Sequence, residues 1–331
     1  MTTRLCDVVI ATKNRPEPLQ RCLRSLARQS VTGFGIIVVD DHSDTPLEAA
    51  VAEVARSERF SVEPVVVRLP RPSGPAAARN AGVAASDAEY VVFIDDDVVL
   101  DRHLVELHLS EVRSAGPGEP PIVTRGPFVE PSDWHPTAWN LWEARMATRG
   151  TNAMVRGDYT PTWRQFHTGN NCMSVDLFRA VGGFDESYQR AEDDELGARL
   201  EMHGVRFHFL PSALAYHYPH RSLESWLAIP RAYAHYTVVL DRDYPQLGYL
   251  ATRKRELAGS NRLLRGARTL FGGTRRTEVV VRLATTFARL THRARLDPLT
   301  LRALSLAYDL NFAGALRAAE AAEVDADQRS A

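Results

Sequence analysis

The chain has 331 residues, of which 44% are hydrophobic and 24% are charged, and its formal net charge at pH 7 is -1. These values are typical of a globular protein that is long enough for one or two domains. A nearly neutral chain has no general attraction for nucleic acid, so we expect no nucleic-acid partner. Cys6, Cys22 and Cys172 fit no paired motif and indicate a reducing compartment without a disulfide framework.

The first residues enter the apolar run LCDVVIAT directly, without the charged and apolar regions that are typical of a signal peptide. No uninterrupted apolar stretch approaches the roughly 20 residues that a membrane-spanning helix needs. We therefore predict a cytoplasmic protein that is soluble or at most attached to the surface of a membrane.

The first hundred residues alternate between short apolar runs and amphipathic segments. The patterns predict strands within residues 7–12, 35–45, 62–70 and 89–98, and helices within residues 18–30, 46–57 and 74–86. This alternation predicts a Rossmann-like α/β fold, a mainly parallel sheet with helices on both faces. In such sheets ligands bind at the carboxyl ends of the strands, where the acidic residues of VVDDHS and FIDDDV lie.

The pattern becomes irregular beyond residue 109. Residues 115–136 are rich in proline and glycine and indicate a connector that contains a strand, and the chain is mostly helical from residue 221. We therefore predict an α/β domain over residues 1–220, with halves at about 1–110 and 111–220, and a helical C-terminal region over residues 221–331.

Three adjacent carboxylates, Asp95, Asp96 and Asp97, follow directly after the apolar run VVFI. They repel one another unless positive charge lies among them. Mg²⁺ and Mn²⁺ prefer oxygen ligands, and Mg²⁺ is typically bound by one or two carboxylates together with substrate phosphates. The cluster therefore indicates either a metal–diphosphate site or a solvated acidic turn after the strand.

The segment VFIDDDVVL also resembles the motif of haloacid-dehalogenase-like phosphatases, in which Asp95 would be the nucleophile. That resemblance further requires a lysine followed by an acidic pair. Here Lys254 is the only downstream lysine, and it follows the acidic group at residues 192–194 instead of preceding it. The order of the motifs therefore argues against a phosphatase.

Six segments, taken in their order along the chain, resemble the inverting family 2 glycosyltransferases of GT-A fold. They are VVIATKNRPEPLQRCLRSLARQS, IIVVDDHSDT, GPAAARNAGV, FIDDDV, GGFDESY and EDDEL, and the match covers roughly residues 7–220. The resemblance implies a hexosyltransferase-type enzyme (EC 2.4) that moves a sugar from a nucleoside-diphosphate sugar to an acceptor hydroxyl with inversion. A retaining GT-A transferase and a non-catalytic nucleotide-sugar-binding protein are the alternatives.

The resemblance implies that the nucleotide base lies at the ends of the first two strands, beside Ala11, Thr12 and Asp41. A carboxylate accepts a hydrogen bond from the N3–H of uracil or thymine, or from the N–H edge of guanine, whereas cytosine has an acceptor at that position. Asp41 therefore favours UDP, dTDP or GDP sugars. Its alternative role is that of a helix cap or turn residue.

The same resemblance implies a role for each of the charged residues near the third motif. Arg79 is expected to face the nucleotide, where it would offset the negative charge of the carboxylates or contact the diphosphate. The alternative is that Arg79 is an ordinary exposed charge on a helix. Asp95 is expected near the ribose or base. Asp96 is expected to share either this role or the metal-binding role of Asp97. Asp97 is expected to bind a divalent metal, Mn²⁺ or Mg²⁺, with His217 as a further ligand.

The segments EDDEL and TGNNCMS carry the remaining implied site residues. On the family's register Asp193 is the general base, supported by Glu192, and the alternative is an ordinary cluster of acids in the first turn of a helix. Gly169 permits close approach between donor sugar and acceptor. Asn170 or Asn171 is expected to hydrogen-bond sugar hydroxyls.

The basic C-terminal region suggests a further contact. Residues 253–295 contain twelve basic residues against two acidic ones, and Val280, Leu283, Phe287 and Leu290 share one helical stripe. Such a stripe more commonly packs against the rest of the protein or a second subunit. The alternative is peripheral binding to an anionic membrane surface, which suits a lipid-linked acceptor, whereas the acceptor is otherwise a small molecule or a glycan.

Overall fold

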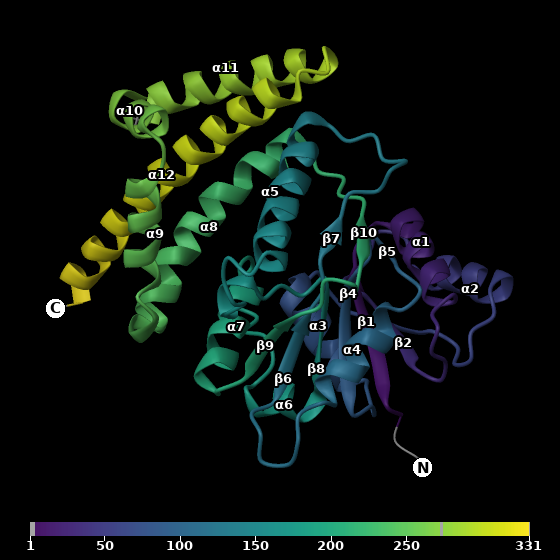
Figure 1. The fold of residues 1–331 in the computed structure, drawn as a ribbon. Helices are drawn as coiled ribbons and strands as arrows, with labels where there is room; N and C mark the ends of the chain where they lie inside the picture. The colour runs from purple at the N-terminus through teal and green to yellow at the C-terminus, as the bar shows by residue number, and fades with distance from the viewer. Residues whose placement is uncertain (1–3, 272–273, 331) are drawn as a thin grey trace. The chain divides into compact units, whose positions relative to one another are not determined.

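The structure, a computed structural model, describes residues 4–271 and 274–330 (Figure 1). The chain forms two compact units, of which the first comprises Met1–Trp134 with Ala147–Tyr218 and the second comprises His135–Met146 with Pro219–Ala331. The second unit thus takes in a short segment from the middle of the chain. A single division at residue 220 does not include this segment.

Within the described residues, the first unit contains a seven-stranded sheet with the order β3-β2-β1-β4-β8-β6-β9. The strands are β1 (Cys6–Thr12), β2 (Gly35–Asp40), β3 (Val65–Arg68), β4 (Tyr90–Asp95), β6 (Ile122–Arg125), β8 (Asn170–Ser174) and β9 (Arg206–Phe209). The neighbours from β3 to β4 are parallel, as predicted, whereas β8 runs antiparallel to β4 and β6. The sheet is therefore mixed in its second half.

Helices cover both faces of this sheet, so the predicted α/β fold is confirmed. One face carries α1 (Pro16–Leu26), α2 (Glu48–Ser57) and α4 (Leu104–Val112), and the other carries α3 (Gly74–Ala84), α6 (Val175–Ala180) and α7 (Glu192–Met202). Successive side chains of β1 alternate between the two cores, with Val8 and Ile10 in one and Val9 in the other. A parallel strand buried on both faces needs apolar residues at every position, which explains the unbroken run VVIA.

A second, three-stranded sheet lies within the first unit and has the order β5-β10-β7. Its strands are β5 (Val98–Leu100), β10 (Ala215–His217) and β7 (Phe128–Val129). β10 is antiparallel to β5 and pairs His217 with Val98, and the backbone N–H of Tyr218 donates a 2.9 Å hydrogen bond to the carbonyl oxygen of Asp97. This pairing brings a late segment of the chain to the acidic cluster.

The second unit is helical and has its own core. It contains the first part of α5 (Ala138–Val155) and the whole of α8 (Leu223–Asp243), α9 (Tyr249–Gly259), α10 (Arg262–Phe271), α11 (Thr274–Arg293) and α12 (Asp297–Ser330). The 3₁₀ turn η2 (Pro245–Leu247) also belongs to this unit, whereas η1 (Trp163–Gln165) belongs to the first unit. Trp226 is fully buried, and its ring contacts those of Trp142 and Tyr308. Among the described helices, none is both long enough and apolar enough to cross a membrane.

The face of α11 that packs within the second unit is not the predicted stripe. Val281, Ala284 and Ala288 are buried there together with residues of α12, whereas Leu283 and Leu290 are 65% and 59% exposed. Small side chains allow two helices to approach closely, and the bulkier residues of α11 therefore remain on its outer side. Val280 of the predicted stripe packs partly against this core, whereas the expected packing against the rest of the chain is wrong for Leu283, Phe287 and Leu290. Packing of the stripe against a second subunit stays a prediction.

Candidate functional site

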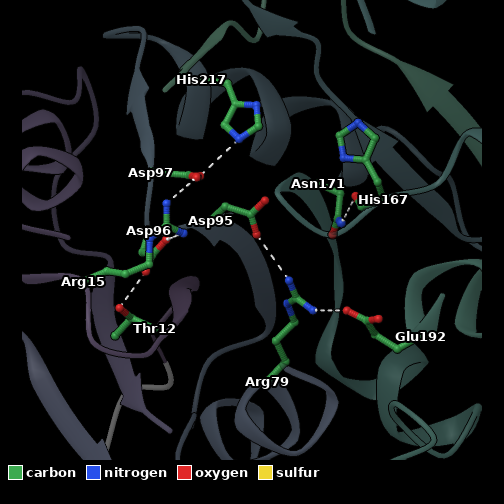
Figure 2. Close-up of polar contacts among 10 residues, drawn as sticks. All are labelled: Thr12, Arg15, Arg79, Asp95, Asp96, Asp97, His167, Asn171, Glu192 and His217. Atoms are coloured by element: carbon green, nitrogen blue, oxygen red, sulfur yellow. Dashed lines mark hydrogen bonds and ion pairs between the residues drawn. The ribbon is translucent and has the colours of Figure 1, made fainter. Parts of the chain in front are cut away.

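The site is built at the edge of the sheet where β1, β2 and β4 end. Ala11 pairs with Asp95 in the parallel register of β1 and β4, and Asp41 follows directly after β2. Asp96 and Asp97 form the turn between β4 and β5, and both are buried. The fold therefore brings the acidic ends of β2 and β4, as predicted, to one edge. Figure 2 shows the three acids that follow β4.

A cation that the sequence analysis did not single out lies among these carboxylates. Arg15 donates hydrogen bonds of 2.7 Å to Asp96 Oδ1 and to Asp97 Oδ2, and Thr12 Oγ1 donates a 2.7 Å bond to Asp96 Oδ2. Burial raises the pKa of Asp96 to about 7, against the attraction of Arg15. The signal was the position of KNRP, because the loop after a first parallel strand lies at the ligand-binding edge of the sheet.

Asp97 is paired on its other side with an imidazole. Its Oδ1 lies 3.2 Å from His217 Nε2 (Figure 2). The ring of His217 also stacks on Phe128 with a centroid distance of 4.5 Å. Although burial opposes the shift, His217 and Arg15 hold the pKa of Asp97 well below its usual range. The predicted metal ligands are thus adjacent.

The donor set fits a divalent metal that is shared with a diphosphate. Among the residues that the structure describes, no group of three or more histidine, cysteine or acidic side chains converges as a metal site. Asp97 and His217 nevertheless offer an oxygen and a nitrogen side by side, and Mg²⁺ commonly takes its other ligands from substrate phosphates and water. Manganese accepts both carboxylate and imidazole ligands.

Arg79 connects the acidic cluster to the first turn of α7. Its Nη2 donates to Asp95 Oδ1 at 3.2 Å, and its Nη1 donates to Glu192 Oε1 at 2.9 Å (Figure 2). Glu192 is the first residue of α7, and Asp193 follows it. The guanidinium of this side chain, which is only 11% exposed, lies between two carboxylates and fixes the separation of the strand end and the helix start.

Asp193 is half-buried at the beginning of α7, and its Oδ1 accepts a 3.0 Å hydrogen bond from the backbone N–H of Asp194. Burial, followed by repulsion from Glu192 and Asp194, raises its pKa well above the usual range, while Arg79 opposes the shift. A carboxylate with a raised pKa is a stronger base than an ordinary aspartate.

Asp41 has a capping role, as the alternative proposed, but it caps α3 and not α2, the helix that follows it in the sequence. Its Oδ1 accepts a 2.6 Å hydrogen bond from the backbone N–H of Ser73, and its Oδ2 accepts a 3.1 Å bond from Gly74. These donors lie at the beginning of α3, and Lys13 Nζ is 3.8 Å from Asp41 Oδ2. Each carboxylate oxygen has a second lone pair, so capping leaves acceptor capacity for a base.

Gly169, directly before β8, and Asn170, the first residue of β8, have different functions. A Cβ atom at Gly169 would overlap the carboxylate of Asp95 and the ring of Phe128, so only glycine permits this approach. The Asn170 amide nitrogen donates to the carbonyl oxygens of Pro127 and Ala213, and its oxygen lies 2.8 Å from His108 Nε2. Both polar groups of the Asn170 amide are thus already paired within the protein, so its predicted contact with a sugar is not supported.

Asn171 faces the opposite side of β8 and is accompanied by His167, which sequence reasoning missed. Asn171 Nδ2 donates a 2.5 Å hydrogen bond to the carbonyl oxygen of His167, and its Oδ1 is buried without a partner in the described part of the chain (Figure 2). Arg125 Nε donates to His167 Nε2 at 2.6 Å, so the proton of the neutral ring lies on Nδ1. Burial, followed by the charge of Arg125, lowers the pKa of His167 well below its usual range.

His167 Nδ1 is also buried without a partner among the described residues. An unpaired donor at His167 and an unpaired acceptor at Asn171 therefore occur in neighbouring side chains (Figure 2). The only signal in the sequence was that His167 directly precedes the TGNN segment. That position does not reveal which ring nitrogen of His167 accepts the hydrogen bond from Arg125.

The sheet order, the flanking helices and the acidic cluster after the central strand define a GT-A fold. Residues 7–169 match the family described as glycosyl transferase family 2, and residues 90–292 match glycosyl transferase family group 2. The chain belongs to the family 2 glycosyltransferases. This membership argues against the haloacid-dehalogenase-like alternative.

Solved structures support the same fold. The crystal structure of S. aureus TarS 1-349 aligns with a TM-score of 0.53 at 17% identity and covers 96% of this chain and 92% of that one. The same TarS fragment in complex with UDP aligns with a TM-score of 0.52 at 18% identity. At these identities the comparison establishes the fold of the chain.

Two sequence relatives have names that state an activity. The chain is 31% identical over 233 residues to the pre-mycofactocin glycosyltransferase of Mycobacterium tuberculosis, covering 67% of this chain and 44% of that protein. It is 30% identical over 228 residues to the validoxylamine A glucosyltransferase of Streptomyces hygroscopicus subsp. jinggangensis, covering 61% of this chain and 52% of that protein. The chain spans about half the length of these curated relatives.

Proposed function

We propose that the protein transfers a sugar from a nucleoside-diphosphate sugar to an acceptor hydroxyl, with inversion at the anomeric carbon. The observation that carries the proposal is the double contact of Arg79 with Asp95 and Glu192. It holds an acidic helix terminus beside an acidic strand end, so that a donor bound to the cluster and a base on α7 would flank one sugar. Two carboxylate groups with different environments suit donor binding and base catalysis.

The nucleotide would bind along the ends of β1 and β2. Ala11 and Thr12 would border the base, and Asp41 would accept its N–H, which favours uracil, thymine or guanine over cytosine. Asp95 would contact the ribose, with Asp96 behind it. A UDP complex and a UDP-GlcNAc complex of S. aureus TarS, which has a similar fold, support a nucleotide-sugar donor.

Asp97 and His217 would hold Mn²⁺ or Mg²⁺, which stabilises the negative charge of the departing diphosphate when it is bound. Arg15 occupies the opposite oxygen of Asp97 and keeps that carboxylate oriented toward His217. The guanidinium also offsets the repulsion between Asp96 and Asp97, so the fold of this turn does not depend on a metal.

Asp193 would remove the proton from the acceptor hydroxyl as its oxygen attacks the anomeric carbon. The new C–O bond forms on the face opposite the bond to the diphosphate, which breaks with its electron pair and leaves with the nucleotide. The raised pKa of Asp193 favours proton uptake at this step. Glu192, held by Arg79, would keep the first turn of α7 in place.

The sugar would lie over Gly169, Asn171 and His167. A sugar hydroxyl both donates and accepts a hydrogen bond, and it therefore matches the unpaired Asn171 Oδ1 and the unpaired His167 Nδ1–H. Gly169 would let the sugar approach Asp95 without a clash. We assign catalysis to the first unit and regard the acceptor as a small molecule, a glycan or a lipid-linked molecule.

The test is an assay of UDP-, dTDP- and GDP-sugars for hydrolysis and transfer, with Mn²⁺, with Mg²⁺ and with EDTA, followed by NMR of the anomeric configuration of the product. We expect turnover of at least one donor with inversion. Retention of configuration would reject Asp193 as the base and favour a retaining GT-A enzyme. Binding of a nucleotide sugar without any turnover would indicate a non-catalytic protein.

A further inference from the structure

The outer side of α11 exposes a row of large apolar side chains, here called the α11 stripe. Val279, Leu283, Phe287 and Leu290 are 57%, 65%, 48% and 59% exposed. Their spacings of four, four and three residues place them on one side of a helix with 3.6 residues per turn. Exposed apolar residues are common singly, but a continuous row along three turns of helix indicates a binding surface.

The stripe is not a displaced core face, because α11 already buries another side. Val281, Ala284 and Ala288 belong to the core of the second unit, and this buried side lies roughly 130° around the helix from the stripe at 100° per residue. Rotating α11 to bury the stripe would expose that core. The helix therefore has two apolar sides, of which the second unit covers only one.

Arginines border the stripe along one edge. Arg282, Arg289 and Arg293 are spaced by seven and four residues, so they form a second row about 100° around the helix from the stripe. All three are exposed. Among the described residues Arg282 and Arg293 have no carboxylate partner, while Arg289 lies over the ring of Trp139 at 5.4 Å. The positive charge along this edge is therefore not neutralised within the described chain.

The preceding helix α10 has similar features. Leu263 and Leu270 are 85% and 64% exposed, and their spacing of seven residues places them on one side of that helix. Arg262 and Arg265 are exposed on the same helix. α10 and α11 are neighbours in the second unit, and they together form most of the segment with twelve basic and two acidic residues (Figure 1).

We propose that the α11 stripe and its arginines lie on the surface of an anionic lipid bilayer. Exposed leucine, valine and phenylalanine side chains would enter the interface, and the unneutralised arginines would contact lipid phosphates. A symmetric dimer through the same surface with the two helices antiparallel fits less well, because its two-fold axis would bring one arginine row against its copy. The proposal stands apart from the sugar-transfer assignment, since no residue of the stripe belongs to the site described above.

The experiment is co-flotation of the full chain with vesicles. One set contains phosphatidylcholine with phosphatidylglycerol, and the other contains phosphatidylcholine alone. We expect the protein to float with the anionic vesicles at low salt, to dissociate as salt increases, and to remain in solution with the neutral vesicles. Failure to float with anionic vesicles at low salt would overturn the proposal.

Two variants test the contributions separately. Arg282→Gln/Arg293→Gln should weaken binding to anionic vesicles by about 25-fold, since each arginine near such a surface contributes about fivefold. Leu283→Gln/Phe287→Gln should weaken it by about tenfold or more because less apolar surface enters the interface. Arg56→Gln/Arg113→Gln, which changes the net charge equally at exposed positions outside α10 and α11, is the control and should bind normally.

Two further explanations are that the rest of the chain covers the stripe, or that a second copy of the protein covers it. Thermal unfolding of the same variants tests the first explanation, and sedimentation velocity tests the second. We expect Leu283→Gln/Phe287→Gln to unfold at an unchanged or higher temperature and to sediment as the wild type does. A clear loss of thermal stability would mean that protein covers the stripe within one chain. Dissociation of a wild-type oligomer by this variant would mean that a second copy covers it. Either result, or equal loss of vesicle binding in the Arg56→Gln/Arg113→Gln control, would overturn the proposal.

Discussion

Arg79 on α3 donates a 2.9 Å hydrogen bond to Glu192 at the start of α7, although 113 positions separate the two residues. The same guanidinium contacts Asp95 at 3.2 Å. One largely buried cation thus sets the separation between Asp193, the proposed base next to Glu192, and the acids that end β4. Removing one partner of such a buried pair leaves the other charges uncompensated, so the contact both stabilises and positions the site.

Asp193→Asn and Asp193→Ala should abolish sugar transfer and leave the affinity for the nucleotide nearly unchanged, because a base acts in the transition state and not in donor binding. Turnover of the preferred donor and calorimetric titration with the nucleoside diphosphate measure the two effects. Asp176→Asn, an exposed aspartate in the first turn of α6, is the control and should remain active. An equal loss of nucleotide binding would place Asp193 in the nucleotide site instead.

The raised pKa of Asp193 predicts how activity and stability depend on pH. The protonated carboxyl cannot act as a base, so kcat/KM should fall about tenfold per pH unit below this pKa. A folded-state pKa above the unfolded value means that the native state binds the proton more tightly, so stability is lost as pH rises through the folded-state pKa. Asp193→Asn should therefore unfold at a higher urea concentration than the wild type above that pKa.

This stability difference between Asp193→Asn and the wild type should disappear at acidic pH, where both side chains are neutral. Urea unfolding at several pH values measures it, and Asp176→Asn serves as the matched control. A constant difference at every pH would show that the substitution acts through packing or hydrogen bonding and not through the charge of Asp193.

Asp97→Asn should lower turnover by a few orders of magnitude while the fold persists, because the neutral amide is a weaker ligand for a divalent cation. Titration of Mn²⁺ in the presence of the nucleoside diphosphate should show the corresponding loss of metal affinity. This measurement does not depend on the activity of the enzyme. Asp87→Asn, an exposed acid before β4, should bind Mn²⁺ as the wild type does. Full activity of Asp97→Asn in EDTA would reject the metal assignment.

Gly169→Ala should reduce nucleotide affinity and lower the free energy of unfolding by about 1–3 kcal/mol, because the added methyl group overlaps Asp95 and Phe128. Gly314→Ala in α12 has open space around the new Cβ and should instead stabilise by about 0.5–1 kcal/mol. Calorimetry of nucleotide binding and urea unfolding report both quantities. Unchanged binding by Gly169→Ala would show that Asp95 tolerates displacement.

The nucleotide-binding half of the fold could be predicted because its signals are local. β1, β2 and β4 are buried on both faces, so each is a continuous apolar run of β-branched residues, and the helices between them show helical spacing. The carboxyl ends of parallel strands necessarily meet at one edge. The clustering of Thr12, Asp41 and Asp95 followed from that rule alone.

The contacts within the site depend on pairings that no local pattern encodes. His217 lies beside Asp97 because β10 pairs with β5 across more than a hundred residues of chain. Asn170 and Asn171 are chemically identical neighbours, and only the register of β8 against β4 decides which of them is buried with His108. A shift of one residue in a strand would exchange their faces, so sequence reasoning left both open.

The sequence by itself determined that α11 is an amphipathic, basic helix, because periodicity and charge are properties of the chain. Which side of that helix is buried was decided by the tertiary structure. α12 packs against the side with small residues, Val281, Ala284 and Ala288, since two helix axes approach closely only where side chains are short. Hydrophobicity alone ranks Leu283 and Phe287 above these alanines, and the geometry of helix packing reverses that order.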